Sequence, residues 1–429
     1  MNPARDWNSL WFDERPTLAV GLFRFVFGSL LLADLVTLWP DIPMWFSDQG
    51  LVSARGSWLY EGWDHFSLLY SVHSPAGAYL FFTLYAVIVI LFTLGLGTRV
   101  VRFLLYIMLI SWHHRAMYIT CGMDIYNAPM AFLFLFAPCD RSFSLDAVLR
   151  KMRRRAAGET ADPPETAPFW GQRMMQIQVS FVYAFAVLQK IQGEPWRNGT
   201  TVYYLQHLVD FYQLPFPGLS SSLLAINFAT HVTLAIQLSL AFLVWIPALR
   251  YYVLILGFIE HLIMMWNINL VIFQAFLMSG FLVFVESSTV GWWLETLRRW
   301  FRSPRPALFV YDAGCAACRA VASGVESLDF FGKVRSMDVR NRSELMAYVR
   351  DGRLPAPGDE PRIIDCEGRM FAGGDAFLWL IWRLPLFWWC APVLSLPGVG
   401  WAVRRACRWL CHRRLFLPPE TSSACPGHC

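Results

Sequence analysis

Long apolar runs constrain the fold of this chain more than any other feature of its sequence. A helix needs about 20 mostly apolar residues to cross the hydrocarbon core of a bilayer, and eight runs approach that length. These runs are 17–39, 76–97, 100–119, 125–138, 171–190, 222–246, 249–267 and 269–286. Only 16% of the residues are charged, compared with about 25% in soluble domains. The sequence therefore predicts a polytopic α-helical membrane bundle of about eight spans.

Basic residues predict how this bundle is oriented. Six of them lie in one short segment after the fourth run, namely Arg141, Arg150, Lys151, Arg153, Arg154 and Arg155. Loops rich in Lys and Arg stay on the cytoplasmic side. An eight-span topology puts Arg250 and the basic segment 298–305 on that same side, while segments 40–75 and 191–221, with few basic residues, face outward. We therefore expect a bacterial inner-membrane protein with both termini in the cytoplasm.

The ends and the charge of the chain add two expectations. The charged start, residues 1–16, leads directly into a full-length apolar run, so no cleavable signal peptide is expected. The formal net charge of +5 is explained by the anchoring loops. Membrane lipids are therefore the expected partners, and a nucleic acid is not.

A second domain is predicted after the last apolar run. Residues 298–306 are basic, contain proline and have the character of a linker. Beyond them, β-rich and helical stretches follow in the order β-α-β-α-β-β-α, which is typical of a thioredoxin-like fold. The first of these helices is expected to bury Val321, Val325 and Leu328 on one face. The predicted domains are a transmembrane bundle (1–297), the linker (298–306), an α/β thioredoxin-like domain with amphipathic C-terminal helices (307–417) and a flexible Cys-containing tail (418–429).

Two cysteines lie where the first predicted strand meets the following helix, in the sequence YDAGCAACRA (311–320). A thiolate at a helix N-terminus is stabilised by unpaired N–H groups and by the helix dipole. In this arrangement Cys315 is the exposed attacking thiol and Cys318 is the buried thiol that closes the disulfide. Two alternatives stay open: half of a zinc site, which needs a second ligand pair, and a structural pair that only packs. We favour the redox dithiol and predict no metal site.

Two residues near the dithiol each have a structural and a functional interpretation. Asp312 either ends the strand and caps the turn, or it is a buried carboxylate that carries the proton of the Cys318 thiol. Pro361 opens the third predicted strand. It is either an ordinary strand-initiating proline or a cis-proline that faces the dithiol, as thioredoxin-like folds commonly have.

The C-terminal part, residues 307–417, resembles the DCC family of thiol-disulfide oxidoreductases, which is named after the motif Asp-x-x-Cys-x-x-Cys. The matching residues and segments are Asp312, Cys315, Cys318, 373–385 and 396–414. The family usually has glycine directly after the aspartate, where this chain has Ala313. The resemblance implies thiol-disulfide exchange with a protein thiol or disulfide as partner.

Several ionisable residues lie within the predicted spans or at their ends: His113, His114, Arg115, Asp124, Lys190, Glu260 and His261. Charged groups are costly in a bilayer and usually face a bundle interior or a cavity. Together they predict a polar cavity in the outer half of the bundle, suited to a lipophilic small molecule. Each residue also fits a structural role. Arg115 and Lys190 would extend to the interface, and Glu260 and His261 would pair to stabilise helix contacts.

Most of residues 10–290 resemble the HTTM domain, the transmembrane module related to vitamin K-dependent γ-carboxylase. The matching features are Arg115, Gly122, Asp124, Pro138, the SLDA at 144–147, Lys190, Trp196, Gly199, Glu260 and His261. The resemblance makes a quinone a candidate ligand of the membrane half, although no cofactor is firmly implied. Carboxylase activity itself is not expected. Arginine cannot supply the strong base because its pKa exceeds about 12, and Lys190 lies in a different helix from the matching segment.

Two functions are compatible with these features. The first is a membrane-bound thiol-disulfide oxidoreductase, a protein-disulfide reductase in type, that exchanges electrons with a protein thiol and with a quinone in the bundle. The second is a transporter or lipid-binding protein whose C-terminal domain senses redox state or stabilises assembly. In the first case Cys315 and Cys318 carry the activity, and in the second Asp124, Glu260 or His261 do.

Overall fold

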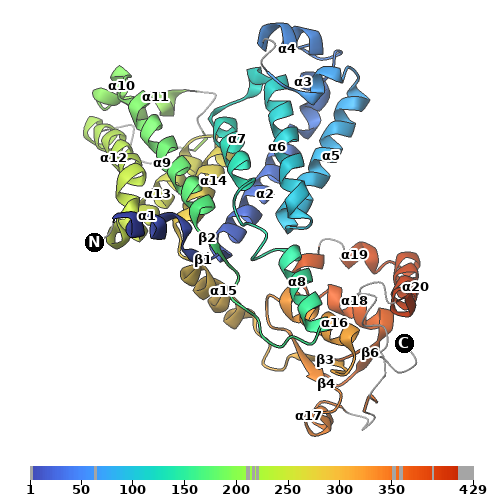
Figure 1. Ribbon diagram of the computed structural model, residues 1–429. Coiled ribbons are helices and arrows are strands. Elements are labelled where there is room, and N and C mark those ends of the chain that lie inside the picture. Colours follow the sequence, from blue (N-terminus) through green and yellow to red (C-terminus); the bar gives the residue numbers. More distant parts are fainter. Residues whose placement is uncertain are drawn as a thin grey trace. The chain divides into compact units, whose positions relative to one another are not determined.

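The computed structural model describes residues 3–61, 65–208, 213–214, 218, 222–349, 354–356, 361–388 and 391–413 (Figure 1). Contacts divide the chain into two units. The first consists of Met1–Ser144 and Glu165–Val290, and the second of Leu145–Pro164 and Gly291–Cys429. The segment Leu145–Pro164 lies inside the range predicted for the transmembrane bundle but groups with the C-terminal unit. The predicted tail (418–429) lies outside the described residues.

The first unit is built mainly from long helices. They are α2 (Leu18–Leu38), α5 (Pro75–Leu94), α6 (Thr98–Arg115), α7 (Gly122–Phe134), α9 (Trp170–Lys190), α12 (Leu223–Phe242), α13 (Pro247–Asn267) and α14 (Val271–Ser279). One of these helices coincides with each of the eight predicted spans. Its shorter helices are α1 (Pro3–Phe12), α3 (Ile42–Phe46), α4 (Ala54–Glu61), α10 (Glu194–Arg197) and α11 (Thr201–His207), with 3-10 turns η1 (Trp39–Asp41), η2 (Leu68–Ser71), η3 (Met117–Ile119), η4 (Leu243–Trp245) and η5 (Gly280–Phe284).

Within the described residues, four helical stretches are long and apolar enough to cross a membrane. They are Leu18–Phe46, Pro75–Leu94, Leu223–Trp245 and Pro247–Asn267, with a fifth if the bent pair Val271–Phe284 and Ser287–Phe301 is one span. Helix α7 has only 13 residues, and α6 and α9 carry several polar residues that lower their mean hydropathy. The chain is thus a multi-pass membrane protein by these helices, and the count of eight stays a prediction.

A buried arginine joins three segments of the first unit. Arg24 of α2 is fully buried, and its Nη1 donates to the carbonyl of Phe92 at 3.0 Å, while its Nη2 donates to that of Phe143 at 2.5 Å. Phe92 lies in the last turn of α5, and its carbonyl also accepts the amide of Gly95 at 3.0 Å. Gly95 follows in the left-handed conformation, with φ of 67°, and a Cβ there would overlap the guanidinium of Arg24. The carbonyl of Phe92 at the end of α5 is therefore bonded by both the Arg24 guanidinium and the Gly95 amide.

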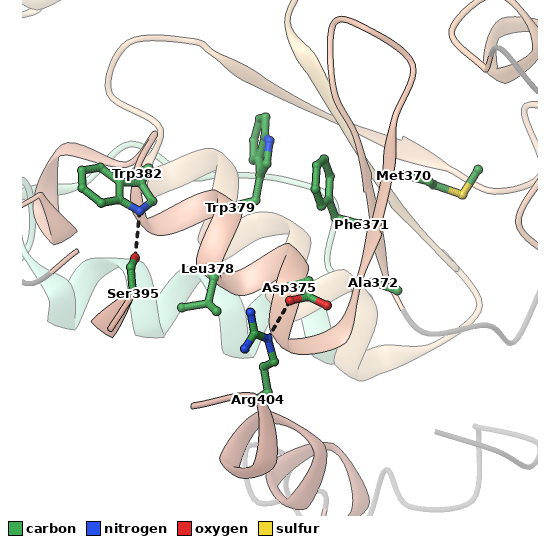
Figure 2. A pocket seen from close by; sticks show the side chains of 9 residues that line it. All are labelled: Met370, Phe371, Ala372, Asp375, Leu378, Trp379, Trp382, Ser395 and Arg404. Carbon is green, nitrogen blue, oxygen red and sulfur yellow. Dashed lines mark hydrogen bonds and ion pairs between the residues drawn. The ribbon is translucent and has the colours of Figure 1, made fainter. Parts of the chain in front are cut away.

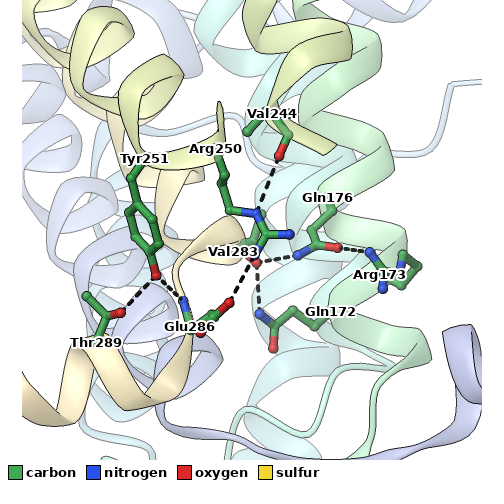
Figure 3. A network of polar contacts seen from close by, with 9 residues as sticks. All are labelled: Gln172, Arg173, Gln176, Val244, Arg250, Tyr251, Val283, Glu286 and Thr289. Carbon is green, nitrogen blue, oxygen red and sulfur yellow. Dashed lines mark hydrogen bonds and ion pairs between the residues drawn. The ribbon is translucent and has the colours of Figure 1, made fainter. Parts of the chain in front are cut away.

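Side-chain amides tie α9 to η5 in the same unit (Figure 3). Gln172 and Gln176 both donate from Nε2 to the carbonyl of Val283 at 2.8 Å. Both glutamines are buried, so these bonds offset the cost of placing their amides away from water. Nearby, the short antiparallel strands β1 (Glu14–Pro16) and β2 (Thr166–Pro168) hold the segment before α2 against the segment before α9.

The second unit contains a small mixed sheet. Its strands are β3 (Ala307–Tyr311), β4 (Val334–Asp338), β5 (Arg362–Ile364) and β6 (Met370–Ala372), in the spatial order β4-β3-β5-β6. Strand β3 pairs parallel with β4 and antiparallel with β5, and β6 pairs antiparallel with β5. The helices of this unit are α8 (Leu145–Ala156), α16 (Ala316–Leu328), α17 (Arg342–Met346), α18 (Gly373–Ile381), α19 (Ala391–Leu394) and α20 (Pro397–Arg413), with the turn η6 (Pro385–Phe387). Helix α15 (Ser287–Phe301) precedes the sheet. The element order predicted from the sequence is confirmed.

Both faces of the sheet are covered by apolar side chains. Leu308 and Val310 of β3 pack on one side with Ile364, while Ala307 and Phe309 pack on the other with Ile363. This alternation along β3 and β5 is the period of two that a strand imposes. A strand that is buried on both faces has a continuous run of apolar residues in its sequence. The sequence ALFVY of β3 is such a run.

The predicted apolar face of α16 is partly wrong. Val325 is buried as expected, but Val321 is 41% exposed. The buried side of the helix instead includes Cys318, Ala322 and Val325, which are spaced four and three residues apart and so lie on one face. The small residues Ala322 and Gly324 allow close approach of neighbouring elements. A prediction of the buried face from the largest apolar residues of the helix does not take such small residues into account.

Candidate redox site

The dithiol lies at the junction of β3 and α16. Strand β3 ends at Tyr311, and Cys315 is the N-cap residue of α16, with φ of −89° and ψ of 123°. Its carbonyl accepts the amide of Arg319 at 3.0 Å, which closes the first turn of the helix. Cys318 lies within that turn. No disulfide joins the two cysteines. Cys315 occupies the position where a helix N-terminus stabilises negative charge.

The exposure predicted for Cys315 is wrong. Cys315 is 8% exposed and Cys318 is 6% exposed, so both are buried. The sequence predicts that Cys315 lies at the start of a helix. The burial of its side chain depends on the segments that pack around that helix start, which the sequence does not show.

Asp312 contacts the turn that leads to the dithiol. Its Oδ1 accepts the amide of Gly314 at 2.8 Å and lies 3.2 Å from Nη2 of Arg340. These contacts fit the interpretation in which Asp312 orders the turn. Pro361 stands directly before β5, as predicted. The peptide bond before it involves residue 360, which lies outside the described residues, so its cis geometry stays a prediction.

Arg319 connects the dithiol turn with α8. Its Nη1 donates to the carbonyl of Ala313 at 2.7 Å, within the turn. Its Nε and Nη2 donate to the carbonyls of Arg155 and Ala156, each at 3.0 Å. These carbonyls belong to the last turn of α8, and that of Arg155 also accepts the amide of Gly158 at 3.1 Å. One guanidinium thus bonds the end of α8 and holds the turn before Cys315.

The ionisable residues of the membrane half fall into two groups. The first surrounds the end of α6 and the start of α7. His113 Nε2 lies 3.2 Å from Asp124 Oδ1, although outside hydrogen-bond geometry, and Asp124 Oδ2 accepts the amide of Cys121 at 2.8 Å. His114 Nδ1 donates to a carbonyl, that of Phe66, at 2.9 Å.

Arg115 belongs to the same group. It is fully buried, which excludes the predicted extension of this side chain to the interface. Its Nη2 donates to the carbonyl of Val52 at 2.8 Å, and its own carbonyl accepts the hydroxyl of Ser57 at 2.7 Å. Arg115 therefore fastens the segment between α3 and α4 to the end of α6.

The second group joins α9, α12, α13 and α14. Lys190 Nζ donates to Gln237 Oε1 at 2.7 Å, and Gln237 Nε2 donates to Glu260 Oε1 at 2.9 Å. His261 Nδ1 donates to Gln274 Oε1 at 2.5 Å, and its Nε2 lies 2.7 Å from the hydroxyl of Tyr183. Glu260 and His261 therefore bond to different partners and are not the pair that the structural interpretation predicted.

Sequence reasoning missed several polar residues that lie within the predicted spans. Arg24 and Asp34 lie in the apolar run 17–39, and the rule that selected the other ionisable residues of the spans applies to them equally. Gln237 and Gln274 are uncharged amides, so only their positions inside apolar runs could have indicated a role.

A separate pocket of about 500 Å³ lies in the second unit (Figure 2). Its lining residues are Met370, Phe371, Ala372, Asp375, Leu378, Trp379, Trp382, Ser395 and Arg404. Two polar contacts join residues that line the pocket. Arg404 Nε lies 2.7 Å from Asp375 Oδ1, and Trp382 Nε1 donates to Ser395 Oγ at 2.9 Å. No residue predicted for the redox site lines this pocket.

Comparison with known proteins identifies both halves of the chain. The model of the HTTM domain matches residues 12–289, and that of the DCC1-like thiol-disulfide oxidoreductase matches residues 309–418. No curated protein and no solved structure matched the chain. The oxidoreductase domain implies a protein thiol partner, and the apolar helices imply contact with lipid. The chain therefore belongs to the HTTM domain family and carries a DCC1-like thiol-disulfide oxidoreductase domain after its membrane half.

Proposed function

We propose that this protein is a membrane-bound thiol-disulfide oxidoreductase whose reactive group is the Cys315–Cys318 dithiol. The observation that carries the proposal is the position of Cys315 as N-cap of α16, directly after β3, with Cys318 in the first helical turn. The unpaired N–H groups of that turn favour a thiolate at Cys315 over a thiol.

The reaction proceeds in two exchanges. The Cys315 thiolate attacks a disulfide of the partner and forms a mixed disulfide, releasing one partner thiolate. The Cys318 thiolate then attacks Cys315, forms the intramolecular disulfide and releases the second partner thiolate. Two electrons and two protons pass from the dithiol to the partner. Because the dithiol domain is expected to face the reducing cytoplasm, reduction of the partner is the favoured direction.

The sheet supports a thioredoxin-like fold for this domain. Its first strand, β3, lies between its second, β4, and its third, β5, and the fourth strand is at the edge. This is the arrangement expected of a minimal thioredoxin-like core, in which the dithiol follows the central first strand and a cis-proline precedes the third. Pro361 has the corresponding position before β5.

The membrane half has a proposed role as the site of a lipophilic electron partner. After the dithiol has reduced its protein partner, the Cys315–Cys318 disulfide would be returned to the dithiol by two electrons and two protons from a hydroquinone, which becomes a quinone. Buried polar side chains in α9, α12 and α13 would give the quinone oxygens hydrogen-bond donors and acceptors. From the apolar runs we also infer eight spans, and from the basic loops a bacterial inner-membrane location and a cytoplasmic dithiol.

A redox titration of the full chain in lipid nanodiscs tests the proposed function. The protein is equilibrated with glutathione buffers of increasing disulfide content, and its thiols are alkylated and weighed by mass spectrometry. The expected result is loss of two alkylated thiols in one step, both assigned to Cys315 and Cys318. Retention of both thiols throughout the titration would exclude the redox function.

A second candidate function, a transporter or lipid-binding protein, is favoured by one observation. Glu260 is 6% exposed, and its Oε2 has no hydrogen-bond partner among the described residues. A buried carboxylate oxygen without a partner is costly, so a ligand or water is expected there.

Glu260→Gln separates the two functions. If the membrane half carries a separate binding activity, this variant loses the small molecule that co-purifies with the chain, as identified by mass spectrometry. The double variant Cys315→Ser, Cys318→Ser would retain it. A quinone among the co-purified molecules favours the first function, and a phospholipid or solute favours the second. Equal retention of the molecule by both variants would contradict a site at Glu260.

A further inference from the structure

Helix α8 belongs by its contacts to the unit that holds the dithiol, although it lies in the chain between α7 and α9 of the membrane half. Figure 1 shows it alongside α16, and the two helices are in contact. Met152 of α8 lies so close to Gly324 of α16 that a Cβ there would be 2.9 Å from its Sδ atom. A larger residue at position 324 would require the Met152 side chain to shift.

Arg319 of α16 makes polar contacts with the end of α8. All three guanidinium nitrogens of Arg319 donate to backbone carbonyls. Two of these carbonyls lie at the end of α8, and the third lies in the turn before Cys315. Bonds from a charged donor to a carbonyl are stronger than those between neutral groups. A cation is also favoured at a helix C-terminus, where the dipole is negative. The position of α8 and that of the dithiol turn are therefore set by the same group.

We propose that Arg319 is a positioning residue that couples the docking of α8 to the redox state of the dithiol. The bonds described above are those of a chain in which no disulfide joins Cys315 and Cys318. Formation of the disulfide requires the two Sγ atoms to approach to about 2.05 Å. This approach moves Cys315 and the turn that Arg319 holds through Ala313. Docked α8 therefore favours the dithiol over the disulfide.

The coupling acts in both directions. If docking of α8 favours the dithiol, then oxidation must weaken the docking of α8 by the same free energy. Because α8 continues through the chain into α7 and α9, the membrane helices receive a signal that depends on the redox state of Cys315 and Cys318. This inference rests on the proposed function, since it needs a dithiol that is oxidised reversibly. In the experiment below the oxidant is a small-molecule disulfide, which takes up the two electrons and two protons.

The test uses the full chain in nanodiscs, equilibrated with glutathione buffers, with two readouts. The first is the ratio of disulfide to dithiol at each buffer composition, measured by alkylation and mass spectrometry. The second is hydrogen–deuterium exchange in residues 145–156. In the unaltered chain α8 is expected to exchange faster after oxidation. Arg319→Gln should raise the disulfide-to-dithiol ratio about tenfold, which is about 30 mV for a two-electron couple, and α8 should exchange fast in both states.

Three further variants make the result specific. Met152→Ala loosens the α8 contact without touching Arg319 and should change both readouts in the same direction, which also covers the case in which Arg319→Gln does not fold. Arg319→Lys keeps the charge but not the planar fork, so it should retain only part of the effect. Arg335→Gln is the control, because Arg335 is exposed and its Nη2 lies 3.5 Å from Oε2 of Glu344. Both the disulfide-to-dithiol ratio and the exchange of α8 should stay unchanged in this variant.

The two proposals fail in different ways. If the dithiol forms no disulfide in any variant, the proposed function is wrong. If the disulfide forms normally but Arg319→Gln and Met152→Ala leave its ratio and the exchange of α8 unchanged, the coupling is wrong and the function stands. If Arg319→Lys matches the unaltered chain in both readouts, charge alone is sufficient and the positioning role of the guanidinium is excluded.

Discussion

Replacing Cys315 by serine is expected to reduce thiol-disulfide exchange by the full chain to the rate of the uncatalysed reaction. The substitution removes the atom that forms the mixed disulfide, and a serine hydroxyl is not deprotonated near neutral pH. The structure gives Cys315 the N-cap position of α16, where its thiolate is the one stabilised by the helix N-terminus. The measurement is the reduction of a fluorescent disulfide substrate by the purified chain in nanodiscs.

Cys318→Ser is expected to give a different result. The first exchange still occurs, but no second thiol releases the partner, so a mixed disulfide on Cys315 accumulates and is detected as a mass increase. Cys366→Ser is the matched control, because Cys366 is an exposed cysteine of the same unit in the turn between β5 and β6. Undiminished exchange in Cys315→Ser, or a stable adduct on Cys366, would assign the reaction to another thiol.

Arg24→Met is expected to destabilise the membrane half strongly. Methionine fills much of the same space but cannot donate to the carbonyls of Phe92 and Phe143, which the guanidinium bonds at 3.0 and 2.5 Å. Each hydrogen bond from a charged donor contributes about 1.5–3 kcal/mol. Removing the buried charge offsets part of this loss, so we expect a net destabilisation of about 2–4 kcal/mol.

The measurement is the thermal midpoint of the purified chain, followed by fluorescence-detected size-exclusion chromatography. Arg99→Met is the matched control, because Arg99 is an exposed residue at the start of α6, and its midpoint should be unchanged within error. Equal midpoints for the two variants would mean that Arg24 does not hold the end of α5.

Local patterns predicted much of the second unit. The run ALFVY, the helical spacing after Cys315 and the turn between β5 and β6 each follow from a few neighbouring residues. Strand and helix periods of two and 3.6 residues are set by the backbone alone. These signals were enough to place the Cys-x-x-Cys motif between a strand and a helix. They were not enough to predict that Cys315 is buried, that Val321 is exposed or that Asp312 pairs with Arg340.

The membrane half shows the same division. Apolar length predicted where its long helices lie, because a bilayer demands a minimum number of apolar residues whatever the tertiary contacts are. The rule for charges in a bilayer also selected His113, Asp124, Glu260 and His261, all of which are buried. Their partners were not predictable, since Glu260 bonds to Gln237 and His261 to Gln274, residues on other helices.

Helix α8 marks the limit of sequence reasoning most clearly. Its basic residues identified a loop between two predicted spans, and that inference used only composition and order along the chain. Its contacts with the dithiol unit include the packing of Met152 on Gly324 and the hydrogen bonds from Arg319 to the last carbonyls of α8. These contacts join residues more than 160 positions apart. Sequence periodicity records which face of an element is apolar, whereas the partner of that face is selected by shape and hydrogen bonding in three dimensions.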